Sequence, residues 1–114
     1  MRKILALIVA AACLSAASAA FADSLVVEGN HKAIRRACNG STTITILGNH
    51  NVLTLTGDCA LVQVDGNHNV VKIEGVKRLN VRGNHNMVNW KRGVGGQKAL
   101  VSNLGTANKV THTP

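Results

Sequence analysis

The sequence predicts an all-β fold: a small parallel β-solenoid, similar to a β-roll or β-helix, with about four coils of ~18 residues and two short strands in each coil. The first observation behind it is a recurring tetrapeptide. Gly-Asn-His-Asn begins at Gly48, Gly66 and Gly83, a near copy begins at Gly29, and a degenerate copy begins at Gly105. These glycines are 19, 18, 17 and 22 residues apart. A nearly fixed interval indicates that one structural unit is stacked on itself.

The second observation is the residue pattern between the turns. Each repeat divides into two halves, and each half has a Gly-led turn followed by a short segment such as Val-Leu-Thr-Leu-Thr at 52–56. Apolar and polar residues alternate with period two and β-branched residues dominate, which is typical of half-buried strands. The following side chains are expected to face inward: Leu25, Val27, Ile44, Ile46, Leu53, Leu55, Val62, Val64, Val71, Ile73, Leu79, Val81, Val88 and Trp90.

An antiparallel meander also fits short strands with tight turns. In a solenoid, equivalent residues stack ~4.8 Å apart, so identical turn residues have a contact reason to recur, and in a meander they have none. The solenoid is therefore favoured. The fourth turn position is then expected to form an asparagine ladder, each amide bonding to the next. Its members are Asn51, Asn69, Asn86 and Asn108.

The two ends depart from the pattern. Arg36 stands where an inward apolar residue is expected, so residues 32–37 predict an irregular first coil. Residues 92–98 are a glycine-rich insertion and predict a flexible loop. Asn103 replaces the last inward residue before Gly105. Polar, atypical terminal repeats protect the ends of a stacked array.

Residues 1–22 have the features of a signal peptide. A charged start at Arg2 and Lys3 precedes an apolar run at 4–14 and an Ala-Phe-Ala cleavage site at 20–22. Cleavage after Ala22 leaves residues 23–114 as a single domain, with no transmembrane span, in the periplasm or outside the cell. An alternative treats Cys13 as a lipidated cysteine, with Ala10 three residues before it.

Two cysteines remain after cleavage, Cys38 and Cys59. An even pair in an exported chain predicts a disulfide. The alternative is a pair of buried free thiols.

The charge balance limits the possible partners. Residues 23–114 carry 11 lysines and arginines against 5 carboxylates. Such a cationic exported protein attracts anionic envelope polymers or surfaces, although the charge can also serve solubility alone. Nucleic acid is not expected, because its bases stack on aromatic side chains and Trp90, the single aromatic of this part, faces inward.

The histidines are the sharpest candidate site. His31, His50, His68 and His85 hold the same turn position in successive coils. A column of neutral imidazoles predicts binding of Zn²⁺ or Cu²⁺ as one alternative. The competing interpretation is four exposed turn residues without a metal. Calcium is disfavoured, since these turns offer Asn and His instead of the Asp of calcium-binding β-rolls.

No catalytic constellation is visible. None of the carboxylates is marked as a general acid or base, and the serines lie in no nucleophile motif. We therefore expect no enzyme and no cofactor.

Several of these motifs resemble a family of small exported bacterial proteins catalogued as domain of unknown function 3060. The resemblance rests on Cys38, Thr-Ile-Thr-Ile at 43–46, the Gly-Asn-His-Asn turns and Gly-Asp-Cys at 57–59, and it covers about residues 38–110. It implies export and a β-rich repeat fold, and it supplies no activity. Together these features predict an exported, non-catalytic structural or binding protein of the bacterial cell envelope, with metal binding by the histidine column as the alternative.

Overall fold

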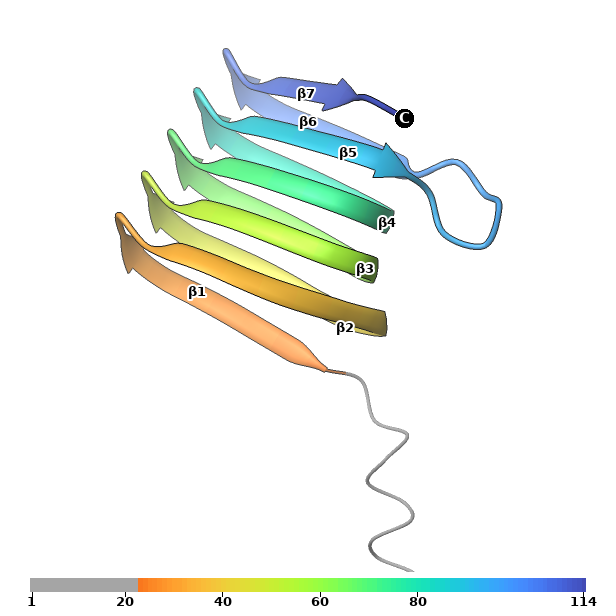
Figure 1. The fold of residues 1–114 in the computed structure, drawn as a ribbon. Coiled ribbons are helices and arrows are strands. Elements are labelled where there is room, and N and C mark those ends of the chain that lie inside the picture. The colour runs from red at the N-terminus through yellow and green to blue at the C-terminus, as the bar shows by residue number, and fades with distance from the viewer. Residues whose placement is uncertain (1–22) are drawn as a thin grey trace, which may run out of the picture.

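The structure is a computed structural model, and it describes residues 23–114. The expected signal peptide, its cleavage site after Ala22 and the alternative at Cys13 lie outside the described residues. The described part consists of strands joined by tight turns and one longer loop (Figure 1). The strands are β1 (Ser24–Asn30), β2 (Ala33–Asn49), β3 (Val52–Asn67), β4 (Val70–Asn84), β5 (Met87–Arg92), β6 (Leu100–Thr106) and β7 (Lys109–His112).

All neighbouring strands pair in parallel. The strand order is β1-β2-β3-β4-β5-β7, and β6 also pairs with β4. Two strands can pair with β4 because the long strands β2, β3 and β4 each bend and run through both sides of a coil (Figure 1). The predicted parallel β-solenoid is thereby confirmed and the meander is excluded. It has about five turns where about four were expected.

The chain forms two sheets that face each other across the core. We call the sheet that leads into each Gly-Asn-His turn the pre-turn face, and the sheet that leaves it the post-turn face. The pre-turn face comprises residues 24–30, 43–49, 61–67, 78–84 and 100–106, in register across all five coils. The post-turn face comprises residues 33–37, 52–56, 70–74, 87–91 and 109–112. The half-turns at the opposite side join the two.

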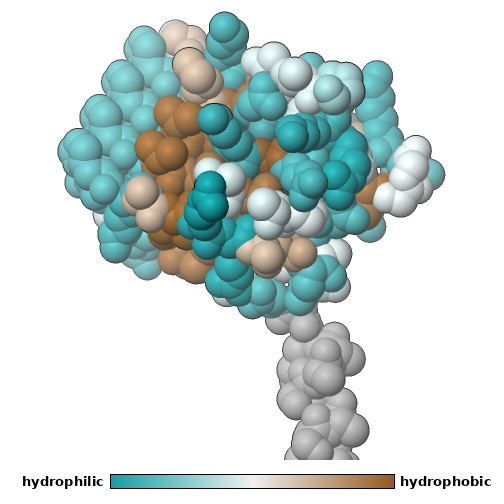
Figure 2. All heavy atoms as spheres, in the orientation of Figure 1, coloured by the Kyte–Doolittle hydropathy of each residue, from teal (hydrophilic) through white to brown (hydrophobic). Residues whose placement is uncertain are grey.

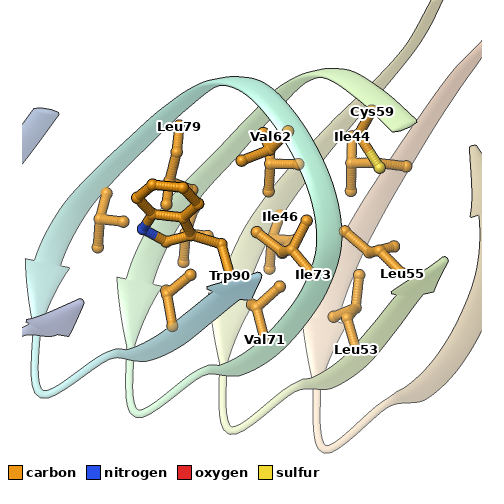
Figure 3. Close-up of a cluster of buried hydrophobic side chains, with 14 of the residues drawn as sticks. Ile44, Ile46, Leu53, Leu55, Cys59, Val62, Val71, Ile73, Leu79 and Trp90 are labelled. Atoms are coloured by element: carbon orange, nitrogen blue, oxygen red, sulfur yellow. The ribbon is translucent and has the colours of Figure 1, made fainter. Parts of the chain in front are cut away.

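The core lies between the two sheets and contains the side chains that the alternation predicts (Figure 3). In the middle coils each sheet contributes two inward side chains to the core, such as Ile44 and Ile46 facing Leu53 and Leu55, all essentially without solvent exposure. Trp90 covers the core toward the C-terminal end, with 6% of its surface exposed. Leu25 is only partly buried, because its strand β1 belongs to the first coil of the described residues. Among the described residues, no helix is long and apolar enough to cross a membrane.

The first coil is more regular than expected. Residues 33–39 pair one to one with residues 52–58, so Arg36 takes the inward position level with Leu55 without disturbing the backbone. Its guanidinium forms an ion pair with the Asp23 carboxylate, and this pair closes the N-terminal end of the core. The insertion at 93–99 leaves the stack as a loop between β5 and β6 (Figure 1).

Candidate functional site

The turns that hold the histidines require unusual backbone angles. His31, His50, His68 and His85 all have φ between 57° and 59°, in the left-handed region that histidine visits more readily than most residues. The preceding glycine is required for a different reason. A Cβ on Gly66 would lie 1.8 Å from the carbonyl oxygen of Gly48, so the stacked turns approach too closely for any side chain.

A buried asparagine ladder fixes the spacing of these turns. The amide Nδ2 of Asn69 donates to Oδ1 of Asn86 at 3.1 Å, and that of Asn86 donates to Oδ1 of Asn108 at 3.0 Å. Each Oδ1 also accepts the backbone N–H of the preceding asparagine, and at the first step this bond, from Asn51 N–H to Asn69 Oδ1 at 3.0 Å, is the one that joins the pair. Each Nδ2 also bonds a glycine carbonyl of the preceding turn. The four predicted ladder residues are therefore brought together.

A second, outer ladder runs beside it. Oδ1 of Asn30, Asn49 and Asn67 each accepts the backbone N–H of the next asparagine in the column, ending at Asn84, at 3.0–3.1 Å. The sequence signal for it was present in the second position of the same tetrapeptide, but no role was predicted for that position. Among the described residues, no buried side-chain polar atom lacks a partner.

The histidine side chains form the predicted column on the outside of the turns. Successive ring centroids are 4.9, 4.9 and 5.0 Å apart and the ring planes are within 6° of parallel. All four rings are exposed. The fifth coil has Ala107 at this position with the same backbone angle, so the column ends at His85.

The stacked geometry opposes a metal shared by neighbouring rings. Parallel rings displaced by one coil have equivalent nitrogens about as far apart as their centroids, 4.9 Å. Two Zn–N bonds of about 2.1 Å span at most about 4.2 Å. The lone pairs also lie in parallel ring planes and do not converge. In the described part of the chain, no group of three or more His, Cys, Asp or Glu side chains is placed to hold a metal.

The half-turn opposite the histidines carries the disulfide. Cys38 and Cys59 are linked across neighbouring coils, with Cα atoms 5.0 Å apart, as the sequence predicted. Cys59 has no solvent exposure. A structural disulfide is typical of proteins in an oxidising compartment.

The post-turn face carries a groove that the sequence analysis did not predict. It has a volume of about 640 Å³ and runs over β3, β4, β5 and β7. The lysines of its lining, Lys72, Lys91 and Lys109, come from three strands and are exposed. Figure 2 shows this face, with an apolar area between the hydrophilic turns at the left and hydrophilic side chains at the right. The groove is also lined by Thr54, Thr56, Val70, Glu74, Met87, Asn89 and Thr111.

The two faces differ in charge. Four basic side chains and one carboxylate point outward from the post-turn face, namely Arg35, Lys72, Lys91, Lys109 and Glu74. The pre-turn face carries two basic side chains, Arg78 and Arg82, and two carboxylates, Glu28 and Asp65, so its charges cancel. The excess positive charge of the flat surfaces therefore lies on the face with the groove.

Glu74, the one carboxylate of the groove, is held in place. The backbone N–H of Gly57 donates to its Oε1 at 2.6 Å, and this hydrogen bond lowers the pKa of Glu74, with the nearby Arg92 guanidinium adding to the effect. Arg92 lies 3.6 Å from Glu74 Oε2 and 2.8 Å from Asp58 Oδ1. These carboxylates thus act as anchors between coils, while Asp65 lies on the opposite face.

No curated protein and no solved structure matches the chain. The family model described as "Protein of unknown function (DUF3060)" matches residues 46–107, which include the copies of the tetrapeptide that begin at Gly48, Gly66, Gly83 and Gly105. By this match over more than half of its length, the chain belongs to the DUF3060 family.

Proposed function

We propose that this protein is an exported, non-catalytic binding protein of the bacterial cell envelope that holds an anionic polymer on its post-turn face. The observation that carries the proposal is the groove lined by Lys72, Lys91 and Lys109 on the more basic of two flat faces.

The groove offers chemistry suited to a polyanion with hydroxyl groups. Lysine ammonium groups attract carboxylates or phosphates as mobile point charges. Thr54, Thr111 and Asn89 add hydroxyl and amide groups that exchange hydrogen bonds with a polysaccharide backbone. Met87 in its lining and the exposed Val52 beside it cover apolar parts of the ligand. A shallow groove that crosses four strands suits an extended chain better than a small enclosed ligand.

The disulfide supports export, because such bonds persist in oxidising compartments. We place the protein in the periplasm or outside the cell. Fractionation of the native cells, with alkylation of Cys38 and Cys59 before and after reduction, tests the location. Thiols that react before reduction in a cytoplasmic fraction would contradict it.

The binding proposal is tested with a matched pair of variants. Lys72→Gln/Lys91→Gln removes two charges from the groove, and Arg78→Gln/Arg82→Gln removes two from the pre-turn face. Polygalacturonate serves as polycarboxylate probe and phosphatidylglycerol vesicles as anionic surface. Each basic side chain near an anionic surface contributes about 1 kcal/mol to binding. The first variant, which loses two such side chains, should therefore bind about thirtyfold more weakly at low salt. The second changes binding little. Equal losses in the two variants would indicate general charge attraction without a site.

A second candidate function is metal binding by the histidine column, favoured by four exposed imidazoles at one position of successive coils. It requires the rings to rotate out of their stack so that two nitrogens converge. Calorimetric titration with Zn²⁺ and Cu²⁺ tests it. Stoichiometric uptake that is lost in His68→Ala supports a metal site, and weak, unsaturable uptake that is unchanged by this substitution rejects it.

A further inference from the structure

In the part of the chain that the structure describes, the strand β6 ends the pre-turn face at the C-terminal side and leaves an open edge. Among these residues its one strand partner is β4. The carbonyl of Thr106 points back to β4, because it accepts the N–H of His85 at 3.1 Å. Backbone groups in a strand alternate in direction, so Leu100, Ser102 and Leu104 also bond toward β4. The N–H and C=O groups of Val101, Asn103 and Gly105 therefore point out along the free edge.

Within residues 23–114, this edge lacks the features that normally prevent pairing. Proteins protect edge strands with charged side chains, proline or a covering segment. The sequence of β6, Leu-Val-Ser-Asn-Leu-Gly-Thr, contains no charge and no proline. Leu100, Val101 and Leu104 are 60%, 42% and 57% exposed, a concentration of apolar surface that no other strand of the structure has. The ligand of such an edge is another β-strand.

The opposite end of the solenoid is a poor partner for it. There the core is closed by the Arg36–Asp23 ion pair, and β1 carries the exposed Glu28. Stacking β6 of one copy on β1 of the next would enclose this ion pair between two coils, and the desolvation of a charged pair costs free energy.

We propose that β6 binds β6 of a second copy of this chain, antiparallel about a two-fold axis that passes at Ser102. In this register Leu100 faces Leu104 of the second copy, so the exposed leucines of each chain cover those of the other. Val101 and Asn103 become the hydrogen-bonded pairs, which agrees with the direction of their free backbone groups. An uncharged strand meets itself without like-charge repulsion, and a two-fold interface closes after two copies.

The register makes a specific prediction for cross-linking. Ser102 lies opposite Ser102 of the second copy as a non-hydrogen-bonded pair, with Cα atoms about 4.5 Å apart, which is within the range that a disulfide spans. Ser102→Cys is compared with Thr45→Cys, which lies in the same column of the sheet but on the internal strand β2. Under mild oxidation, Ser102→Cys becomes a covalent dimer and Thr45→Cys stays monomeric.

Sedimentation of the protein over a range of concentrations gives the independent measurement. We expect the wild type and the Leu47→Lys protein to sediment as dimers. The Leu104→Lys protein is expected to sediment as a monomer, with a dimer dissociation constant raised at least a hundredfold. Leu47 is the matched control, because it is exposed in the same column on an internal strand. A monomeric wild type with no Ser102→Cys cross-link overturns the proposal. Open-ended chains of copies, or association that Leu47→Lys and Leu104→Lys weaken equally, overturn the two-fold β6 interface.

Discussion

Asn69 and Asn86 lie one coil apart in the closed interior of the turn, and the amide of the first bonds to the carbonyl oxygen of the second at 3.1 Å. Both side chains are excluded from solvent. The same Oδ1 of Asn86 also accepts the backbone N–H of Asn69 at 3.0 Å. The Asn86 side chain therefore satisfies two polar groups of the neighbouring coil. Because an asparagine is needed at the same position of each coil, this contact explains why the residue recurs in the sequence.

The ladder makes Asn69→Ala strongly destabilising. The substitution leaves the Asn51 N–H and the Gly48 carbonyl without their partners, at about 1–3 kcal/mol for each buried group. We expect a loss of about 3–5 kcal/mol in the free energy of unfolding, measured by denaturant titration. Asn67→Ala in the outer, partly exposed ladder is the control and costs about 1 kcal/mol. Equal costs for the two substitutions would show that burial of the inner ladder contributes nothing.

The stacking of turns makes Gly66 irreplaceable. Alanine there would place its Cβ 1.8 Å from the Gly48 oxygen at a φ of 143°, so Gly66→Ala abolishes folding or costs more than about 4 kcal/mol. Gly95→Ala in the loop is the matched control, since its Cβ meets nothing within 4 Å at a φ of 65°. That substitution costs about 1 kcal/mol. A soluble, cooperatively melting Gly66→Ala protein would contradict the close approach of neighbouring turns.

Reduction of the disulfide destabilises the protein. Cys38 and Cys59 close a loop across 21 residues, and the loss of a constraint of this length costs about 3 kcal/mol in the chain-entropy account. Denaturant unfolding with and without a strong reductant measures the difference. The Cys38→Ala/Cys59→Ala protein serves as control, because its stability should not respond to the reductant. An unchanged wild type under reduction would contradict a stabilising disulfide.

Much of this fold was predictable because the repeat fixes it locally. The interval between the Gly-Asn-His-Asn turns predicted the length of the coils. The alternation of apolar and polar residues predicted that side chains such as Ile44 and Leu53 face the core. The cysteine pair followed from composition and from the expected oxidising compartment. Each of these features depends on residues that are near one another in the sequence or in equivalent repeat positions.

The groove was not predictable in the same way. Lys72 and Lys91 are at different positions of their repeats, and they line one groove only because β4 pairs with β5. Arg36 was recognised as an exception, yet its partner Asp23 lies just before β1, the first strand of the other sheet, and no pattern in the sequence marks that pair. The bond of Glu74 to Gly57 is a contact of one side chain with the backbone of a neighbouring coil, which alternation does not encode.

Glu74 gives the protein a defined acid sensitivity. The hydrogen bond from Gly57 lowers the pKa of Glu74 in the folded state relative to the ordinary value of 4.5. The stabilisation is therefore complete above pH 4.5 and is lost as the pH falls toward the folded value. Thermal melts between pH 7 and pH 3 should show a steeper loss for wild type than for Glu74→Gln. Parallel curves would mean that the carboxylate makes no favoured contact in the folded state.

We expect an anionic polymer to bind on the post-turn face. Amide chemical-shift changes on titration with polygalacturonate test it most directly, because every strand of both faces reports separately. We expect the shifts within residues 52–56, 70–74, 87–91 and 109–112, which include the lysines of the groove, with residues 43–49 and 78–84 unchanged. Shifts spread equally over both faces, confined to the histidine turns, or absent at low salt would contradict it.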